Sequence, residues 1–152
     1  MKFAAFIALA GAMCAAPALA DTTVIHAGAL VVDAESQPRG PSTITVTDGT
    51  IVSVADGFTA APAQAVTVDL KDKTVVPGMV DLHVHLTGDP GGDFWKGAVE
   101  PDEWDVVVGA KNARLTALAG FTTVREAGSG PASAFSLRRG TAEGFIDGPR
   151  IV

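Results

Sequence analysis

One stretch, residues 75–86, constrains the fold of this chain more than any other. Its sequence, VVPGMVDLHVHL, is a near-continuous apolar run with polar residues only at every second position. This pattern is typical of a strand buried on both faces, as in a parallel sheet covered by helices. We therefore expect a parallel α/β fold in which Asp81, His83 and His85 point to one face of this strand.

A helix is predicted after this strand, following a loop rich in Gly and Asp. Pro101 suits a first helical turn, the acidic Asp102 and Glu103 favour a helix N-terminus, and Gly120 favours a helix end. Four apolar residues lie on one stripe of this helix at helical spacing, and we expect that stripe to pack against the preceding strand. The four are Trp104, Val108, Leu115 and Leu118.

Strand and helix then alternate again. Residues 121–126 are predicted to form a second buried strand, Ala132 to about Glu143 a second helix, and residues 148–152 the approach to a third strand. This order is that of a parallel sheet or a (β/α)₈ TIM barrel. Such a barrel needs about 250 residues, so we expect residues 75–152 to hold only its first two βα units and the chain to be incomplete.

A small β-sandwich domain is predicted for residues 21–74, where short β-type runs alternate with turn residues. The strongest signal is the pair of runs 43–47 and 50–54, because Asp48 and Gly49 between them accept the positive φ angles of a tight hairpin. The predicted strands are residues 22–26, 29–32, 42–47, 50–55 and 66–70.

Residues 1–20 have the features of a secretory signal peptide. Lys2 precedes an apolar run over residues 3–13, and the small-residue site Ala18-Leu19-Ala20 follows. The apolar run is shorter than the roughly 20 residues of a membrane-spanning helix, which disfavours a membrane anchor. We expect cleavage before Asp21 and an exported protein, either periplasmic or secreted.

The composition of the mature chain limits its partners. The only cysteine of the sequence, Cys14, lies in the predicted signal peptide. The mature chain therefore has neither a disulfide nor a thiolate ligand, and any metal must be held by histidine and oxygen ligands. Without Lys2, ten Lys and Arg stand against 17 Asp and Glu, a net charge of −7, which disfavours a nucleic-acid partner. No later segment is long and apolar enough to span a bilayer, so we expect no membrane partner after cleavage.

His83 and His85 are the candidate metal ligands. Side chains two positions apart on a strand share a face, about 6.5–7 Å apart along the strand, and both rings can then reach one ion at Zn–N distances of about 2.0–2.1 Å. The loop that follows places the pair at the C-terminal end of the strand, where barrel active sites lie. Asp81 has the same parity, and we expect it to orient a ligand histidine or to tie down the strand.

Residues 76–86 (VPGMVDLHVHL) resemble the first barrel strand of the amidohydrolase superfamily. Residues 46–51, 120–125 and 148–150 are similar to the same group in the same order, and the last two resemble the imidazolonepropionase-like branch that includes exported Xaa-Pro dipeptidases. The resemblance implies hydrolysis of amide or peptide C–N bonds in a small-molecule or dipeptide substrate. It also implies one or two divalent ions, commonly Zn²⁺, that activate a water and polarise the scissile carbonyl.

The resemblance further implies that His83 and His85 bind the more buried metal. The other ligands of the family are a carboxylated lysine, two histidines and an aspartate that is also the general base, and we expect them beyond residue 152. Arg125, at the end of the second strand, could pair with a carboxylate or substrate or serve the structure. The branch usually carries Asp where this chain has Glu126, whose role is left open.

Other residues have weaker claims to a function. His26 is expected to be a partly exposed strand residue and not a ligand. Asp89, Asp93 and Trp95 follow the histidine strand and could contact substrate or form a solvated turn. Three readings stay open for the chain: a hydrolase given incompletely, a short protein that binds a metal or a partner without catalysis, and a non-functional remnant. A homo-oligomer of the full-length form is also left open.

Overall fold

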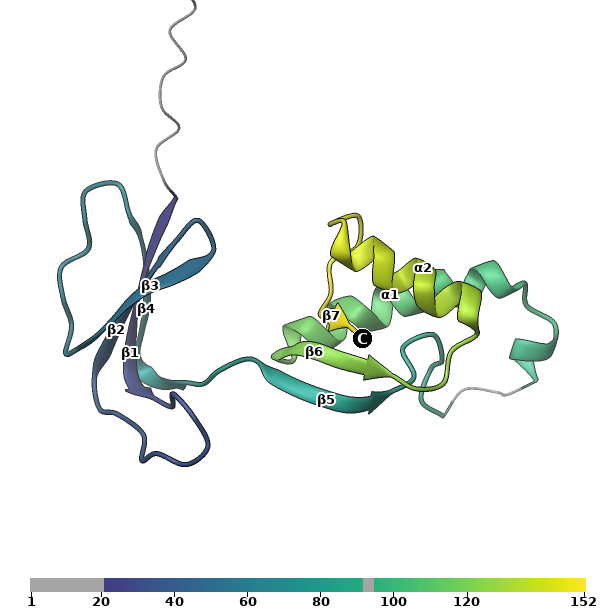
Figure 1. The fold of residues 1–152 in the computed structure, drawn as a ribbon, viewed down its shortest axis with the longest axis horizontal. Coiled ribbons are helices and arrows are strands. Elements are labelled where there is room, and N and C mark those ends of the chain that lie inside the picture. Colours follow the sequence, from purple (N-terminus) through teal and green to yellow (C-terminus); the bar gives the residue numbers. More distant parts are fainter. Residues whose placement is uncertain (1–20, 92–94) are drawn as a thin grey trace, which may run out of the picture. The chain divides into compact units, whose positions relative to one another are not determined.

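The chain divides into two units between Val75 and Val76 (Figure 1). The computed structural model describes residues 21–91 and 95–152. The predicted signal peptide, residues 1–20, and the loop residue Asp93 lie outside the described residues. Within those residues, no helix has the length and apolar character needed to cross a membrane.

The first unit is a four-stranded sheet with the strand order β3-β2-β1-β4. β1 pairs antiparallel with β2 and parallel with β4, and β2 pairs antiparallel with β3. The predicted hairpin between β2 and β3 is confirmed, because Asp48 and Gly49 have φ angles of 49° and 74°. The bounds are β1 Thr22–Leu30, β2 Ser42–Thr47, β3 Thr50–Asp56 and β4 Val66–Val75.

One prediction for this unit is wrong. The strands expected at residues 22–26 and 29–32 are one strand, β1, whose pairing with β4 shifts register between Ala27 and Ala29. Gly28 allows this close passage, because a Cβ there would overlap the carbonyl of Lys71 on β4. The four described strands pair edge to edge in one sheet, and the second layer of the predicted β-sandwich stays a prediction.

The second unit is a parallel sheet with the strand order β5-β6-β7. Helix α1 connects β5 to β6 and helix α2 connects β6 to β7, and both helices lie on the same side of the sheet (Figure 1). The predicted α/β class with parallel strands is confirmed, while closure into an eight-stranded barrel stays a prediction. The bounds are β5 Met79–Val84, a 3-10 helix η1 Lys96–Ala98, α1 Asp102–Leu118, β6 Phe121–Glu126, α2 Pro131–Ala142 and β7 Arg150–Ile151.

The core of the second unit lies between the sheet and the two helices. Helix α1 contributes the small residues Gly109 and Ala113 to the buried surface. A Cβ at Gly109 would lie 2.9 Å from Leu137 Cδ2, so α1 and α2 pack at a distance that only a residue without a side chain permits there. The core cluster consists of Leu86, Ala113, Val124, Leu137 and Ile151.

The apolar stripe predicted for α1 does not form the core. Trp104, Leu115 and Leu118 are exposed, and Val108 is half-buried. Helical spacing identifies an apolar stripe on α1. The buried face is a different one, because the close contact with α2 requires the small residues Gly109 and Ala113. The prediction that this stripe packs against the preceding strand is therefore wrong.

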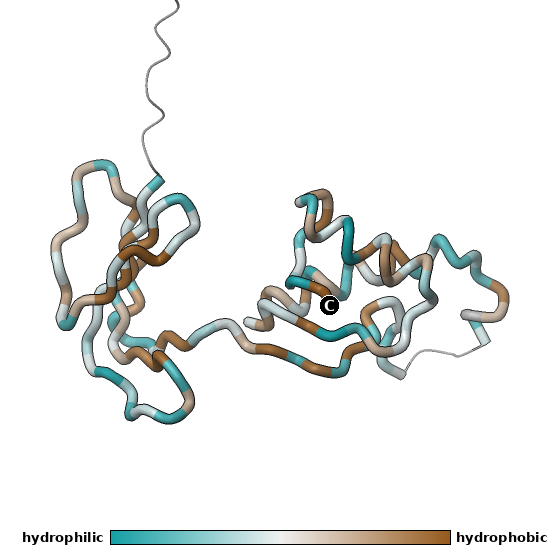
Figure 2. The backbone as a smooth tube through the Cα atoms, viewed as in Figure 1, coloured by the Kyte–Doolittle hydropathy of each residue, from teal (hydrophilic) through white to brown (hydrophobic). Residues whose placement is uncertain are grey.

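Strand β5 is not buried on both faces, contrary to the prediction. Val80 and Leu82 are 57% and 67% exposed, respectively. The physical reason is that β5 is an edge strand of the described sheet, and neither α1 nor α2 covers these two side chains. Figure 2 shows apolar colouring along β5 that is interrupted by hydrophilic segments.

Candidate metal centre

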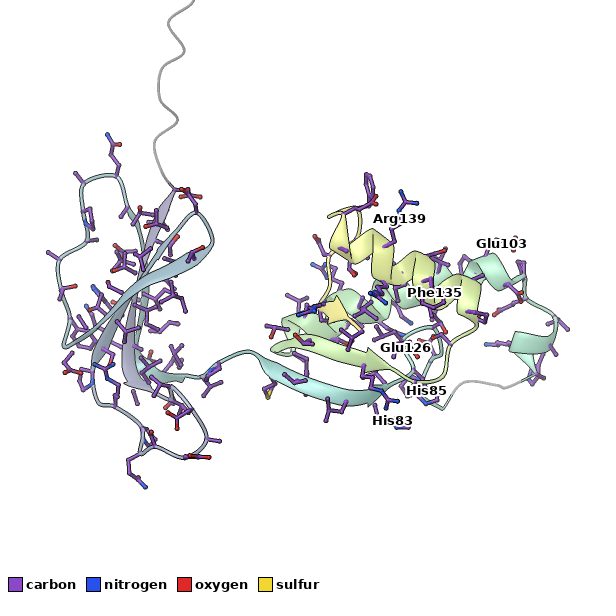
Figure 3. The ribbon with its side chains drawn as sticks, viewed as in Figure 1. His83, His85, Glu103, Glu126, Phe135 and Arg139 are labelled. Atoms are coloured by element: carbon purple, nitrogen blue, oxygen red, sulfur yellow. The ribbon has the colours of Figure 1, made fainter. Side chains whose placement is uncertain are left out.

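The two candidate ligands lie at the C-terminal end of β5, with their rings on the same side. Nε2 of His83 and Nε2 of His85 are 3.1 Å apart. The ring centroids are 5.2 Å apart and the ring planes are inclined by 22°, so the two imidazoles are stacked. Both side chains are exposed, and Figure 3 shows them projecting from the end of the strand. The structure thus brings together the pair that the alternation of the sequence selects.

This geometry fits a shared metal ion. Two nitrogen ligands of a tetrahedral zinc, each about 2.0–2.1 Å from the metal, are separated by about 3.3–3.4 Å. The observed Nε2–Nε2 separation of 3.1 Å is close to that value. In the absence of metal, the same approach allows the Nε2–H of one neutral ring to donate to the bare Nε2 of the other. An ion would take the place of that shared proton.

The described residues supply only part of a metal site. Across residues 21–91 and 95–152, no group of three or more His, Cys, Asp and Glu side chains could hold an ion. His83 and His85 are therefore two donors that need further ligands, from water or from elsewhere.

Asp81 acts on the backbone of the histidine strand. Its Oδ1 accepts a hydrogen bond from the backbone N–H of His83 at 3.0 Å. Of the two roles expected for Asp81, this contact supports tying down the strand. It limits the freedom of the main chain that carries the first ring.

Arg125 reaches from β6 to β5. Its Nη1 donates to the carbonyl of Leu82 at 3.5 Å, a long and weak hydrogen bond. The pairing of β5 with β6 shifts register between Asp81 and Val84, and Arg125 lies beside this irregularity. The contact favours the structural role over the substrate role.

The sequence assigns no role to Glu126, but in the structure its carboxylate has two defined partners. Oε2 accepts the backbone N–H of Leu86 at 2.7 Å, and Oε1 accepts the backbone N–H of Gly128 at 3.0 Å. The side chain therefore joins the end of the histidine strand to the loop between β6 and α2 (Figure 3). No local sequence pattern indicates this role, because the contact with Leu86 joins residues 40 positions apart.

The segment after the histidines is held by two further side chains. Asn112 of α1 donates from Nδ2 to the carbonyls of Leu86 and Gly88, at 2.8 and 3.0 Å. The hydroxyl of Thr87 donates to Ser129 Oγ at 2.7 Å. The loop that follows the ligand pair is thus fixed to both α1 and the β6–α2 loop.

Asp89 is engaged by helix α1. Its Oδ1 accepts from Lys111 Nζ at 2.6 Å and from Asn112 Nδ2 at 3.4 Å. The hydrogen bond from Lys111 lowers the pKa of Asp89 below its ordinary value, partial desolvation opposes this, and Asn112 adds to the lowering. Asp89 therefore serves to anchor the loop, whereas Trp95, just before η1, is exposed.

His26 is buried, contrary to the expectation of a partly exposed residue. Its Nε2 donates to the carbonyl of Thr59 at 2.8 Å, and its ring centroid lies 5.5 Å from that of Phe58. The hydrogen bond and the aromatic contact draw the ring inward. Nδ1 of His26 is buried and has no hydrogen-bond partner among the described residues.

Comparisons with known proteins identify relatives of this chain. No family model matches it. The dihydroorotase of Anaeromyxobacter sp. (strain K) is 36% identical over 97 residues, which are 64% of this chain and 19% of that protein. The chain therefore matches about a fifth of the length of this curated relative.

Solved structures match over more of the chain. The crystal structure of a Xaa-Pro dipeptidase with bound methionine in its active site superposes with a TM-score of 0.75 at 33% identity, over 86% of this chain and 32% of that one. The crystal structure of an amidohydrolase gives a TM-score of 0.70 at 29% identity, over 86% of this chain and 30% of that one. The chain belongs to the amidohydrolase superfamily and corresponds to about a third of these solved members.

Proposed function

We propose that this chain supplies two metal ligands, His83 and His85, to an amidohydrolase that hydrolyses amide or peptide C–N bonds. One or two divalent ions, with zinc as the first candidate, would serve the reaction. The observation that carries the proposal is the 3.1 Å approach of the two Nε2 atoms at the C-terminal end of β5. That end of a parallel strand is where barrel enzymes build their active sites.

The described residues position two metal ligands but do not form a complete catalytic set. A bound divalent ion would lower the pKa of a water and polarise a carbonyl. To bind it, His83 and His85 must each present a bare Nε2, which places the ring proton on Nδ1. Asp81 fixes the main chain at His83. None of the described residues is assigned as the general base.

As the substrate of the whole protein we propose a Xaa-Pro dipeptide. Support comes from the Xaa-Pro dipeptidase structure, which matches 86% of this chain at 33% identity. A cyclic amide is the second candidate, because a dihydroorotase is 36% identical over 97 residues. Release of proline from Xaa-Pro dipeptides by the whole protein, without ring opening of dihydroorotate, would support the first choice, and the opposite result would support the second.

Zinc binding by the chain tests the ligand assignment. Isothermal titration should detect weak binding and an activity assay should detect no turnover, because two imidazoles leave the ion mostly hydrated and none of the described residues is assigned as the base. A His83→Ala, His85→Ala double variant should lose the binding. His26→Ala, which changes the one other histidine of the sequence, is the matched control and should keep zinc binding. Equal binding by the double variant and the wild type would show that other residues are the ligands.

We also propose that residues 1–20 direct export, on the strength of Lys2, the apolar run and the Ala18-Leu19-Ala20 site. N-terminal sequencing of protein recovered outside the cytoplasm should begin at Asp21. Recovery of a chain that still begins at Met1 would contradict this.

A non-catalytic metal-binding role is the alternative to the proposed hydrolase. It would be favoured if the whole protein binds zinc without hydrolysing any C–N bond.

A further inference from the structure

Gly128 lies against the second ligand ring, in the loop between β6 and α2. A Cβ on Gly128 would overlap Nδ1 and Cε1 of His85 and would lie 2.9 Å from Cγ of the same ring. Real Cβ atoms essentially never approach other heavy atoms so closely. The imidazole of His85 therefore occupies the space that a side chain at position 128 would fill.

Backbone conformation does not explain this glycine. Gly128 is not among the glycines with positive φ, so an alanine could adopt its main-chain angles. The requirement for glycine comes from the ring of His85. By contrast, a Cβ on Gly88, which is also without a positive φ, would meet nothing closer than the carbonyl of His85 at 4.0 Å.

Glu126 holds Gly128 and the end of the histidine strand together. One carboxylate oxygen accepts the backbone N–H of Leu86, the residue that follows His85. The other accepts the backbone N–H of Gly128, which lies against the ring of His85. An ionised carboxylate can accept both, because it carries acceptors only. The amide of a glutamine at the same position has one acceptor oxygen and would leave one N–H without its partner.

We propose that Glu126 and Gly128 are positioning residues for the metal ligand His85. Gly128 determines the position of the ring by leaving free the space that a side chain would fill. Glu126 fixes the distance between the backbone at Leu86, next to His85, and the backbone at Gly128, against the ring. The Nε2 of His85 is thereby held 3.1 Å from that of His83. The expected effect of these residues on metal binding rests on the proposed function. Their effect on the position of the His85 ring can be measured without metal.

Four variants of the chain test the proposal: Gly128→Ala, Glu126→Gln, and the matched controls Gly88→Ala and Glu103→Gln. Glu103 is an exposed residue in the first turn of α1 (Figure 3). Two readouts are followed by NMR. One is the nuclear Overhauser effect between the rings of His83 and His85 in the metal-free chain, and the other is the zinc affinity from titration of the ring signals.

We expect Gly128→Ala to abolish the ring-to-ring effect and to weaken zinc binding at least about tenfold, the lower end of the effect seen when groups that orient a ligand are removed. Glu126→Gln should weaken both readouts in the same direction, and both controls should match the wild type. A folded Gly128→Ala with the wild-type effect and affinity would overturn the proposal. Should that variant fail to fold, unchanged readouts in Glu126→Gln would overturn it.

Failure of the proposed function gives a different pattern. If His83→Ala and His85→Ala bind zinc as tightly as the wild type, the two residues are not the ligands. The ring-to-ring effect still decides whether Glu126 and Gly128 position His85, because it needs no metal. Loss of zinc binding in both histidine variants, with wild-type affinity and ring contact in Gly128→Ala, would retain the ligand assignment and reject the positioning role.

Discussion

Asp89 shows how a single carboxylate anchors the loop that follows the candidate metal ligands. Its hydrogen bond with Lys111 lowers its pKa below the ordinary value. A lowered pKa in the folded chain contributes stability above the pKa of the unfolded chain, and this contribution is lost as the pH falls through the folded value. Lys111→Met should raise the pKa of Asp89 back toward the ordinary value, as measured by carboxyl ¹³C shifts across an acid titration.

The control for this titration is Asp33. Its pKa is lowered by hydrogen bonds from the backbone and hydroxyl of Ser36 and from the backbone of Glu35, none of which involves Lys111. Asp33 should titrate identically in the wild type and in Lys111→Met. An unchanged pKa of Asp89 in the variant would show that Lys111 is not the cause of the lowering.

His26 is expected to contribute to stability and not to metal binding. His26→Ala removes a buried ring that contacts Phe58 and the hydrogen bond to the carbonyl of Thr59. We expect a loss of about 1–3 kcal/mol in the free energy of unfolding, measured by urea denaturation. Loss of less than about 0.5 kcal/mol would mean that the ring is not packed as described.

The sequence could predict part of the candidate site, for a definable reason. Alternation along one strand depends only on neighbouring residues, so the common side of His83 and His85 followed from their spacing. The contact between His85 and Gly128 depends on how β5 and β6 pack, over a separation of 43 positions. No local pattern encodes that contact, and the role of Glu126 was unpredictable for the same reason.

At the scale of elements, Leu137 connects α2 to the core of the second unit. Its side chain is completely buried, whereas Phe135 on the same helix is 65% exposed. Leu137→Ala should lower the free energy of unfolding by about 2–5 kcal/mol, because it removes apolar contacts and leaves a cavity. Phe135→Ala is the matched control, and we expect a change within about 0.5 kcal/mol in urea denaturation. Similar losses in the two variants would contradict the packing of α2.

The elements themselves were easier to predict than their faces. The bounds of β2, β6 and α1 follow from local signals such as the Asp48-Gly49 turn and the Pro101 start. The buried face of α1 does not follow from such signals. Gly109 lies on that face because the absence of a side chain allows α2 to approach closely. A hydrophobicity pattern weighs large apolar residues and so overlooks such a contact.

At the scale of the whole molecule, β5 combines an open edge with exposed apolar side chains. Its sequence is that of a strand enclosed on both faces, yet Val80 and Leu82 are exposed in the described structure. Unpaired strand edges and contiguous apolar surface promote association. The chain matches about a third of the solved Xaa-Pro dipeptidase. Its sequence thus encodes a burial pattern that the described residues do not complete.

We therefore expect the chain on its own to self-associate through β5. Leu82 lies on this strand and is 67% exposed, and Leu82→Lys places a charge where a second copy would pack. Sedimentation velocity should detect concentration-dependent association in the wild type and markedly less in the variant. Val99→Ser removes an exposed apolar side chain outside the sheet and should associate like the wild type. Equal association of the wild type and Leu82→Lys would mean that β5 is not the contact surface.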